Sequence, residues 1–222
     1  MTNRKALVLL SGGQDSSTCL FWALKEFEKV WAIGFDYGQR HQSELNAASK
    51  IAAIAKVPYS IFQIDLLKGV SENALTNVEI EIDNSVVKDQ PPNTLVEGRN
   101  LLFITYASIY AKHIGANNLV MGVGQTDYSG YPDCRDEFIQ SAKEAICLAF
   151  DYSLVIHTPL MWKNKAQTWR MANELGVFEL IRAQTVTCYN GIIGDGCGNC
   201  PACKLRKDGL QEFLYETDQI KS

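Results

Sequence analysis

The 222-residue sequence predicts an α/β fold, a parallel five-stranded sheet sandwiched by helices. Two observations predict this class. Short apolar runs alternate with segments whose apolar residues recur at helical spacing. The runs are almost continuously apolar, which is typical of strands buried on both faces of a parallel sheet. We expect one α/β domain over 1–182 and a small Gly- and Cys-rich C-terminal module over 183–222.

Five elements are expected in the first part of the chain. Residues 5–10, KALVLL, are a buried strand, and the apolar stripe over 15–28 predicts a helix. A second strand is expected over 30–38. The next helix, 41–56, is followed by Pro58, and the alternating 59–66 is the third strand.

The second part continues the alternation after an irregular stretch, 67–98, whose length suggests a functional loop. The expected helices cover 100–116, 135–150 and 163–176, and the expected strands cover 118–124 and 152–160. Polar residues cluster after the strands, at 11–17, 36–41, 124–135 and 159–165. Because ligands bind at the carboxyl ends of parallel strands, the site is expected there.

The composition and charge disfavour a nucleic-acid-binding protein and a membrane protein. The chain has 21 basic and 25 acidic residues and a net charge of -4, so we expect no strong grip on nucleic acid. No apolar stretch approaches the roughly 18 residues of a membrane span, and the N-terminus resembles no signal peptide. We therefore expect a cytoplasmic protein without a membrane partner, whose seven cysteines are not structural disulfides.

The segment SGGQDSS, residues 11–17, lies between a predicted strand and a predicted helix. Glycines there allow close backbone approach, and the helix N-terminus offers unpaired N–H groups, so a phosphate site is expected. Asp15 would repel a polyphosphate unless a divalent cation bridged them, which predicts Mg²⁺ bound with ATP. The alternative is a tight turn at Gly12 and Gly13 followed by a helix cap at Asp15.

The same string resembles the PP-loop, S-G-G-x-D-S, of the ATP pyrophosphatase superfamily. The resemblance implies an adenine nucleotide alpha hydrolase-like, Rossmann-like domain that cleaves ATP between the α and β phosphates and forms an adenylated intermediate. The ATP-binding residues that it implies are Val8, Leu9, Leu10, Ser11, Gly12, Gly13, Gln14, Asp15, Ser16, Ser17 and Thr18.

Four cysteines follow a C-x8-C-x2-C-x2-C pattern, at Cys188, Cys197, Cys200 and Cys203. Four thiolates are the full ligand set of a closed, structural zinc site, so we expect one Zn²⁺ per chain. An iron–sulfur cluster or redox disulfides are the alternatives. Cys19 and Cys147 are expected in the core.

A dense polar loop, 124–138, offers aromatic rings for stacking and carboxylates that can accept from a guanine-like edge. A plain surface loop is the alternative. Cys134 has no His near it in sequence, which disfavours a nucleophilic role.

Together these clusters resemble the 7-cyano-7-deazaguanine synthase (QueC) family of queuosine biosynthesis. The likeness rests on residues 10–18, 35–41, 98–103, 127–138 and 158–160 and on the terminal cysteines; Glu97 stands where the family pattern leads us to expect Pro. The resemblance implies that 7-carboxy-7-deazaguanine, ammonia and ATP give the 7-cyano product (preQ0) through an amide, in a homodimer that uses free ammonia. It implies catalytic roles for Asp15, Arg99 and Lys163.

The substrate would be held by Arg99, Asn100, Tyr128, Tyr131, Asp133 and Arg135. Lys163 or Lys165 would neutralise charge on pyrophosphate, although lysines at a helix start are more often solvated, and His41 is as readily a solvated residue. Two other functions stay open: a tRNA thiolase of the same superfamily, and a non-enzymatic nucleotide sensor with a zinc knuckle.

Overall fold

The computed structural model describes residues 4–67, 73–77, 79–83, 92–126 and 131–221. Its centre is a five-stranded sheet in the order β3-β2-β1-β4-β5, and every neighbouring pair is parallel. The predicted α/β class and strand number are therefore confirmed. The strands are β1 (Lys5–Leu9), β2 (Lys29–Asp36), β3 (Tyr59–Gln63), β4 (Asn118–Val120) and β5 (Val155–His157).

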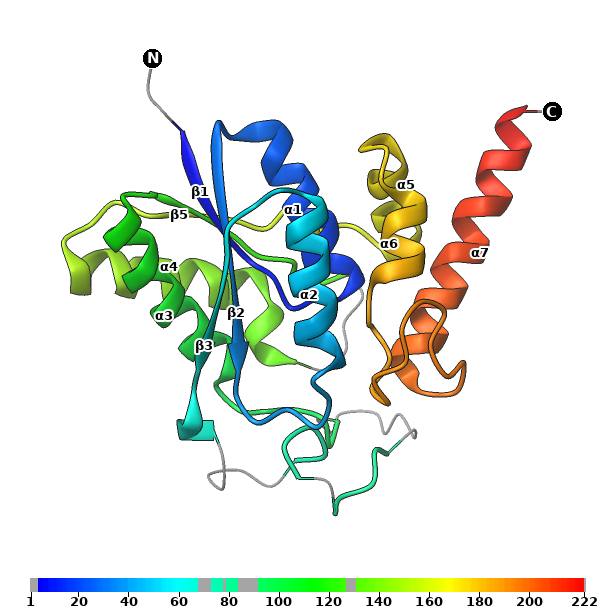
Figure 1. Ribbon diagram of the computed structural model, residues 1–222, viewed down its shortest axis with the longest axis horizontal. Helices are drawn as coiled ribbons and strands as arrows, with labels where there is room; N and C mark the ends of the chain where they lie inside the picture. The colour runs from blue at the N-terminus through cyan, green and yellow to red at the C-terminus, as the bar shows by residue number, and fades with distance from the viewer. Residues whose placement is uncertain (1–3, 68–72, 78, 84–91, 127–130, 222) are drawn as a thin grey trace.

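Helices cover both faces of the sheet (Figure 1). One face is covered by α1 (Gln14–Glu26) and α2 (Ser43–Ile54), and the other by α3 (Arg99–Ile114) and α4 (Asp136–Phe150). Beyond α1 lie α5 (Lys165–Glu174), α6 (Phe178–Gln184) and α7 (Pro201–Lys221). Two short 3-10 turns, η1 (Asp65–Leu67) and η2 (Pro132–Cys134), complete the described elements.

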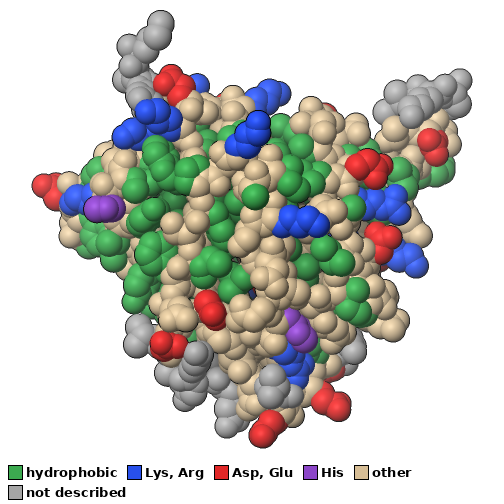
Figure 2. All heavy atoms as spheres, in the orientation of Figure 1, with side chains coloured by type: hydrophobic (Ala, Val, Ile, Leu, Met, Phe, Trp, Pro, Cys, Tyr) green, Lys and Arg blue, Asp and Glu red, His purple; other side chains and the backbone are tan. Residues whose placement is uncertain are grey.

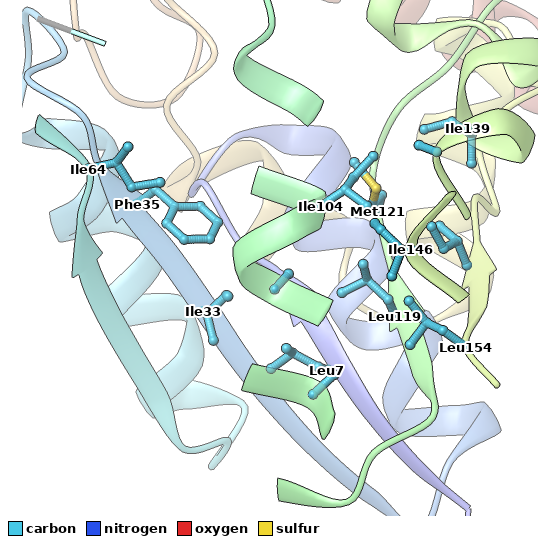
Figure 3. Packing of buried hydrophobic residues seen from close by; sticks show 14 of the residues in the cluster. Leu7, Ile33, Phe35, Ile64, Ile104, Leu119, Met121, Ile139, Ile146 and Leu154 are labelled. Atoms are coloured by element: carbon cyan, nitrogen blue, oxygen red, sulfur yellow. The ribbon is translucent and has the colours of Figure 1, made fainter. Parts of the chain in front are cut away.

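In the first strand, residues 6–9 are all apolar, and their packing explains why. Leu7 packs into the cluster under α3 and α4, whereas Ala6 and Val8 pack into the cluster under α1 and α2. Because successive side chains point to opposite faces, a strand covered on both sides has no polar position. Figure 3 shows Leu7 and Ile33 of the sheet beside α3 in the first of these clusters.

The last two strands are much shorter than expected. β4 ends at Val120, and the chain beyond it turns to follow the segment after β5, where the Gln125 N–H donates to the Met161 carbonyl at 2.9 Å. The segment before β5 belongs to the end of α4, because Asp151 takes a left-handed conformation and the Tyr152 N–H returns to the Cys147 carbonyl at 3.3 Å.

The C-terminal region contains a long helix that the sequence analysis did not predict. α7 packs against α5, and Phe213 joins Trp169 and Ile181 in a separate apolar cluster. Gly209 allows this approach, since a Cβ there would lie 2.5 Å from the Cβ of Lys165. The expected boundary between residues 182 and 183 stays a prediction, and α7 shares its core with the helices before it.

The surface carries charges of both signs. On the face in Figure 2, Lys and Arg side chains are scattered among acidic ones and form no continuous basic field. Among the helices in the described ranges, none is both long and apolar enough to cross a membrane.

Candidate active site

A large cavity opens at the carboxyl ends of the strands, where the polar clusters were expected to meet. Its volume is about 1560 Å³, more than a drug-sized ligand requires. The walls come from the loop after β1, the segment before α2, the start of α3, the loop before α4 and the start of α5. The space therefore accommodates two ligands, such as a nucleotide and a second small molecule.

The loop after β1 is shaped by Gly12. This residue has a φ of +87°, and a Cβ on it would lie 2.2 Å from the Glu44 carbonyl oxygen and 2.7 Å from the Ala48 nitrogen. Only glycine lets the loop lie this close to α2. The hydroxyls of Ser11 and Ser16 are 3.0 Å apart, so the loop folds back on the first turn of α1.

The start of α1 faces the cavity. The first N–H groups of a helix have no partner within the helix and form an anion-binding end. Gln14 is buried and lines the cavity, and neither polar atom of its amide has a hydrogen-bond partner in the described part of the chain. These unsatisfied groups fit a polyphosphate ligand.

The predicted ATP-binding residues divide into two groups. Leu9, Leu10, Ser11, Gly13, Gln14, Asp15 and Ser16 line the cavity. Val8, Gly12, Ser17 and Thr18 do not line it. Val8 is a core residue, and the Thr18 hydroxyl donates to the Gln14 carbonyl at 2.8 Å inside α1.

Lys165 forms an ion pair with Asp15, at the end of the loop after β1. Its Nζ donates to both carboxylate oxygens of Asp15 at 3.0 Å, and only 10% of its side chain is exposed. Lys165 is therefore not a solvated lysine, which was the alternative to a role at the site. A capping box between Asn164 and Gln167 fixes the start of α5 and aims Lys165 inward. Lys163 also lines the cavity, whereas His41 does not.

Residues near the C-terminus buttress the loop. The Val186 N–H donates to the Gly12 carbonyl at 2.9 Å, and the Gln14 N–H donates to the Thr187 hydroxyl at 3.4 Å. Arg206 in α7 donates to the Thr187 hydroxyl at 2.9 Å. Burial lowers the pKa of Arg206 to about 10, and its guanidinium lies 4.9 Å from the Trp169 ring. The sequence analysis did not select this arginine.

Arg99 and Asn100 lie together at the opposite wall, at the start of α3. Arg99 donates to the Tyr37 hydroxyl at 3.4 Å, and its guanidinium lies near the Tyr37 and Phe103 rings. Its Nε is buried without a partner in the described ranges. Arg99 therefore keeps donor capacity for an anionic ligand.

The loop before α4 is tied to the same helix start. The Asn100 backbone N–H donates to Asp133 Oδ2 at 3.1 Å, and the Asn100 side chain donates to the Asp133 carbonyl at 3.1 Å. Tyr131 is buried, with its hydroxyl 2.6 Å from that of Thr94. Asp133 thus helps to anchor the loop, a role that the sequence analysis did not foresee.

The other members of this predicted set are placed as follows. Arg135 and Cys134 line the cavity, and Tyr128 lies outside the described residues. Burial, reinforced by Asp133, raises the pKa of Cys134 to about 11. A thiol of that pKa is protonated at neutral pH, which agrees with the expectation that Cys134 is no nucleophile.

Glu44 is a further cavity residue that the sequence analysis did not single out. It occupies the first turn of α2, next to the phosphate loop. Burial raises the pKa of its carboxyl to about 7, and the positive charge of Arg99 only partly offsets this. No sequence signal marks it, because a glutamate in the first turn of a helix is ordinary.

The four predicted metal ligands come together beside the cavity. The sulfurs of Cys188, Cys197, Cys200 and Cys203 all lie within 4.8 Å of one another. Although desolvation raises the pKa of Cys197, the backbone N–H groups of Asn199 and Cys200 outweigh it and hold that pKa below its usual range. Four clustered thiols with N–H···S contacts suit a tetrahedral metal site.

Comparison with known proteins identifies the family. The family described as "Queuosine biosynthesis protein QueC" matches residues 5–214. The chain is 55% identical to a 7-cyano-7-deazaguanine synthase of Bacteroides fragilis over 219 residues, covering 99% of this chain and 100% of that protein. The chain belongs to the QueC family. A second QueC relative, the 7-cyano-7-deazaguanine synthase of Clostridium acetobutylicum, is 52% identical and covers 97% of this chain and 98% of its own.

A solved structure outside the QueC family shares the fold. A 4-thiouridine synthetase in complex with RNA and bound ATP superposes with a TM-score of 0.52 at 17% identity, over 95% of this chain and 50% of that one. The match supports the predicted Rossmann-like fold. The QueC relatives carry the name of a synthase, which confirms the predicted family, the expectation of an enzyme and the link to queuosine biosynthesis.

Proposed function

We propose that this QueC-family chain converts 7-carboxy-7-deazaguanine and ammonia to 7-cyano-7-deazaguanine at the expense of ATP. The observation that carries the proposal is a single cavity bounded by the phosphate loop on one side and by Arg99 and Asn100 on the other. A nucleotide on the loop and an acid held by Arg99 would face each other across this space. The named relatives support the same reaction.

ATP would bind with its phosphates at the start of α1. A carboxylate is a poor electrophile, and attack of its oxygen on the α phosphorus gives an acyl adenylate with AMP as a good leaving group and pyrophosphate as product. Lys163 and Lys165 line the cavity as cations that would stabilise the negative charge on the departing pyrophosphate. The implied catalytic roles of Asp15, Arg99 and Lys163 stay proposals.

Magnesium fits the loop by chemistry. Asp15 and the hydroxyls of Ser11 and Ser16 are the oxygen donors that Mg²⁺ prefers, and Mg²⁺ bound with ATP neutralises phosphate charge. The Asp15 carboxylate already has Lys165 as a counter-charge. We therefore assign Lys165 to orienting Asp15 toward the phosphates.

The deazapurine would occupy the wall formed by α3 and the loop before α4. Tyr131, Arg135 and Asn100 line this wall, and Tyr128 is the fourth proposed contact. One carboxylate oxygen of Asp133 already accepts from Asn100, so we assign Asp133 first to holding the wall in place. Arg99 would pair with the substrate carboxylate.

The nitrogen of ammonia would then be incorporated first into an amide and afterwards into the nitrile. Its nitrogen attacks the acyl adenylate, the bond to AMP breaks, and the amide forms. The amide oxygen next attacks the α phosphorus of a second ATP, and loss of that oxygen with AMP leaves the nitrile. Both activations need the same contacts, so one nucleotide site serves both.

The metal and assembly proposals rest on other parts of the chain. Four thiolate ligands leave no open position, so we assign the cysteine cluster to structural Zn²⁺. We assign homodimer contacts to apolar side chains exposed on β3 and α3, namely Ile61, Leu101, Tyr106 and Ile109. A cytoplasmic location and the absence of nucleic-acid partners complete the proposal.

Purified protein tests the reaction directly. Incubation with ATP, Mg²⁺, ammonium and 7-carboxy-7-deazaguanine is expected to yield the nitrile by mass spectrometry, and omission of any one component is expected to abolish it. ATP turnover without nitrile, or ATP-dependent thiolation of tRNA in its place, would refute the proposed function. Size-exclusion chromatography with light scattering would test the dimer.

A further inference from the structure

Glu44 lies where the two halves of the cavity meet. Its backbone carbonyl contacts the phosphate loop at Gly12, and its side chain lines the cavity. The Arg99 guanidinium, which also contacts Tyr37, acts on the Glu44 carboxyl through its positive charge. The carboxylate therefore lies between the proposed phosphate site and the proposed carboxylate site.

The Glu44 carboxylate has no structural task in the described part of the chain. No hydrogen bond or ion pair ties it to a described residue, although it is mostly withdrawn from solvent. Among the described residues, the titratable groups that act on it are Arg99 from α3 and Tyr37 from the segment before α2, and Asp15 and its partner Lys165 line the same cavity. A buried carboxyl with a pKa near neutrality can exchange protons at working pH.

The proposed chemistry requires a base beside the nitrogen. Ammonia carries three N–H protons and the nitrile carries none. One proton leaves when nitrogen attacks the acyl adenylate and the amide forms. Two more leave when the adenylated amide loses AMP and becomes the nitrile. Each departure leaves its electron pair on nitrogen for the new C–N bond, so each needs an acceptor for the proton.

The other acidic groups of the described cavity wall are less suited to this task. Asp15 is held by Lys165, and Glu97 is exposed to solvent. Asp83 has its own contacts in the described structure, and the Cys134 thiol receives a hydrogen bond from Asn100 at 3.4 Å. Glu44 is the acid that is both sheltered and uncommitted.

We propose that Glu44 is the general base that accepts the N–H protons of the nitrogen nucleophile during amide and nitrile formation. The inference rests on the proposed function and adds a catalytic residue to it. After each transfer the protonated carboxyl returns its proton to solvent through the open cavity.

A nucleophile that needs no strong base distinguishes a general-base role of Glu44 from a structural role. Hydroxylamine is far less basic than ammonia, is neutral near pH 7, and traps acyl adenylates as hydroxamates. The Glu44→Gln variant is expected to form hydroxamate from ATP and the 7-carboxy substrate at close to the wild-type rate. With ammonium, its amide and nitrile formation is expected to fall by about 10²–10⁴-fold.

The pH profile provides a second readout. When the rate is expressed per free ammonia, to remove the protonation of the nucleophile itself, the wild-type rate is expected to fall below about pH 7 as Glu44 becomes protonated, and this fall is expected to be absent in Glu44→Gln. Glu212→Gln, an exposed change on α7, is the matched control and is expected to behave as the wild type.

Two results with the Glu44→Gln variant would overturn the assignment of Glu44 alone. One is nitrile formation by Glu44→Gln within threefold of the wild-type rate. The other is a loss of hydroxamate formation as severe as the loss with ammonium, which would mean a structural role. A wild-type protein that makes hydroxamate but no nitrile would overturn the proposed function, and the assignment with it.

Discussion

Replacing Glu44 by Gln is expected to stabilise the folded protein at alkaline pH and to leave its stability unchanged in acid. Burial raises the pKa of this carboxyl from 4.5 to about 7. The folded state therefore holds the Glu44 proton more tightly than the unfolded state does. Stability is lost as the pH rises between these two values, because the folded chain must ionise a buried group.

The size of the effect follows from the same values. The pKa of Glu44 in the folded state and its ordinary value of 4.5 differ by about 2.5. One pKa unit corresponds to about 1.36 kcal/mol, so the ionised Glu44 carboxylate lowers the free energy of unfolding by about 3 kcal/mol above pH 7. A glutamine has the shape of the protonated acid and avoids this cost. For a chain of this length, Tm would rise by roughly 6–12 °C at pH 8.

Chemical denaturation of the metal-loaded protein at pH 4.5 and pH 8 measures this difference. The gain in free energy of unfolding from Glu44→Gln is expected to be small at pH 4.5 and to reach its full size at pH 8, with an unchanged m value. The exposed control variant Glu212→Gln is expected to leave the free energy of unfolding unchanged at both pH values. Equal effects of Glu44→Gln at both pH values would refute the argument that burial of the charge destabilises the fold.

Three further changes test other parts of the site. Gly12→Ala, at a φ of +87° and against α2, is expected to cost roughly 2–6 kcal/mol by calorimetry, whereas Gly176→Ala, at +72° with no atom within 4 Å, costs only about 1–2 kcal/mol. Lys165→Met leaves Asp15 without its ion-pair partner. Because 35% of the Asp15 side chain is exposed, the substitution is expected to cost only about 1–2 kcal/mol in stability. ATP turnover is expected to fall by about 10²-fold or more. Cys200→Ser is expected to lose bound zinc by metal analysis and to lower Tm, and an unchanged Tm would mean that the metal is not structural.

The parts of the fold that follow a local pattern could be predicted from the sequence. β1 to β3 and α1 to α4 carry continuous apolar runs or helical stripes, and each was expected close to its observed position. α7 was missed because Cys203 lies in its first turn and Cys200 directly precedes it, and the cysteine spacing drew attention away from the helical periodicity that follows. β4 is short because the chain after it bonds to the segment after β5, and β5 is short because the residues before it complete the end of α4.

The candidate site also contains some residues that a local sequence pattern predicts and others that it does not. The phosphate loop and the cysteine cluster are contiguous or nearly so, and their spacing alone indicates their chemistry. Lys165, Arg206 and Glu44 are isolated in sequence, and each gains its role only when folding brings it to the loop after β1. Lys165 is separated from Asp15 by 150 positions. The capping box at Asn164 was the one local signal that the start of α5 is held in a fixed orientation.

Transfer of the substrate's own oxygen to the nucleotide tests the account most directly. The wild-type protein would be given ATP, ammonium and 7-carboxy-7-deazaguanine labelled with ¹⁸O in the carboxylate, and the products would be weighed by mass spectrometry. If the phosphate loop presents the α phosphorus to the acid, the label appears in AMP and pyrophosphate stays unlabelled. Label in inorganic phosphate, with ADP as the nucleotide product, would contradict the account.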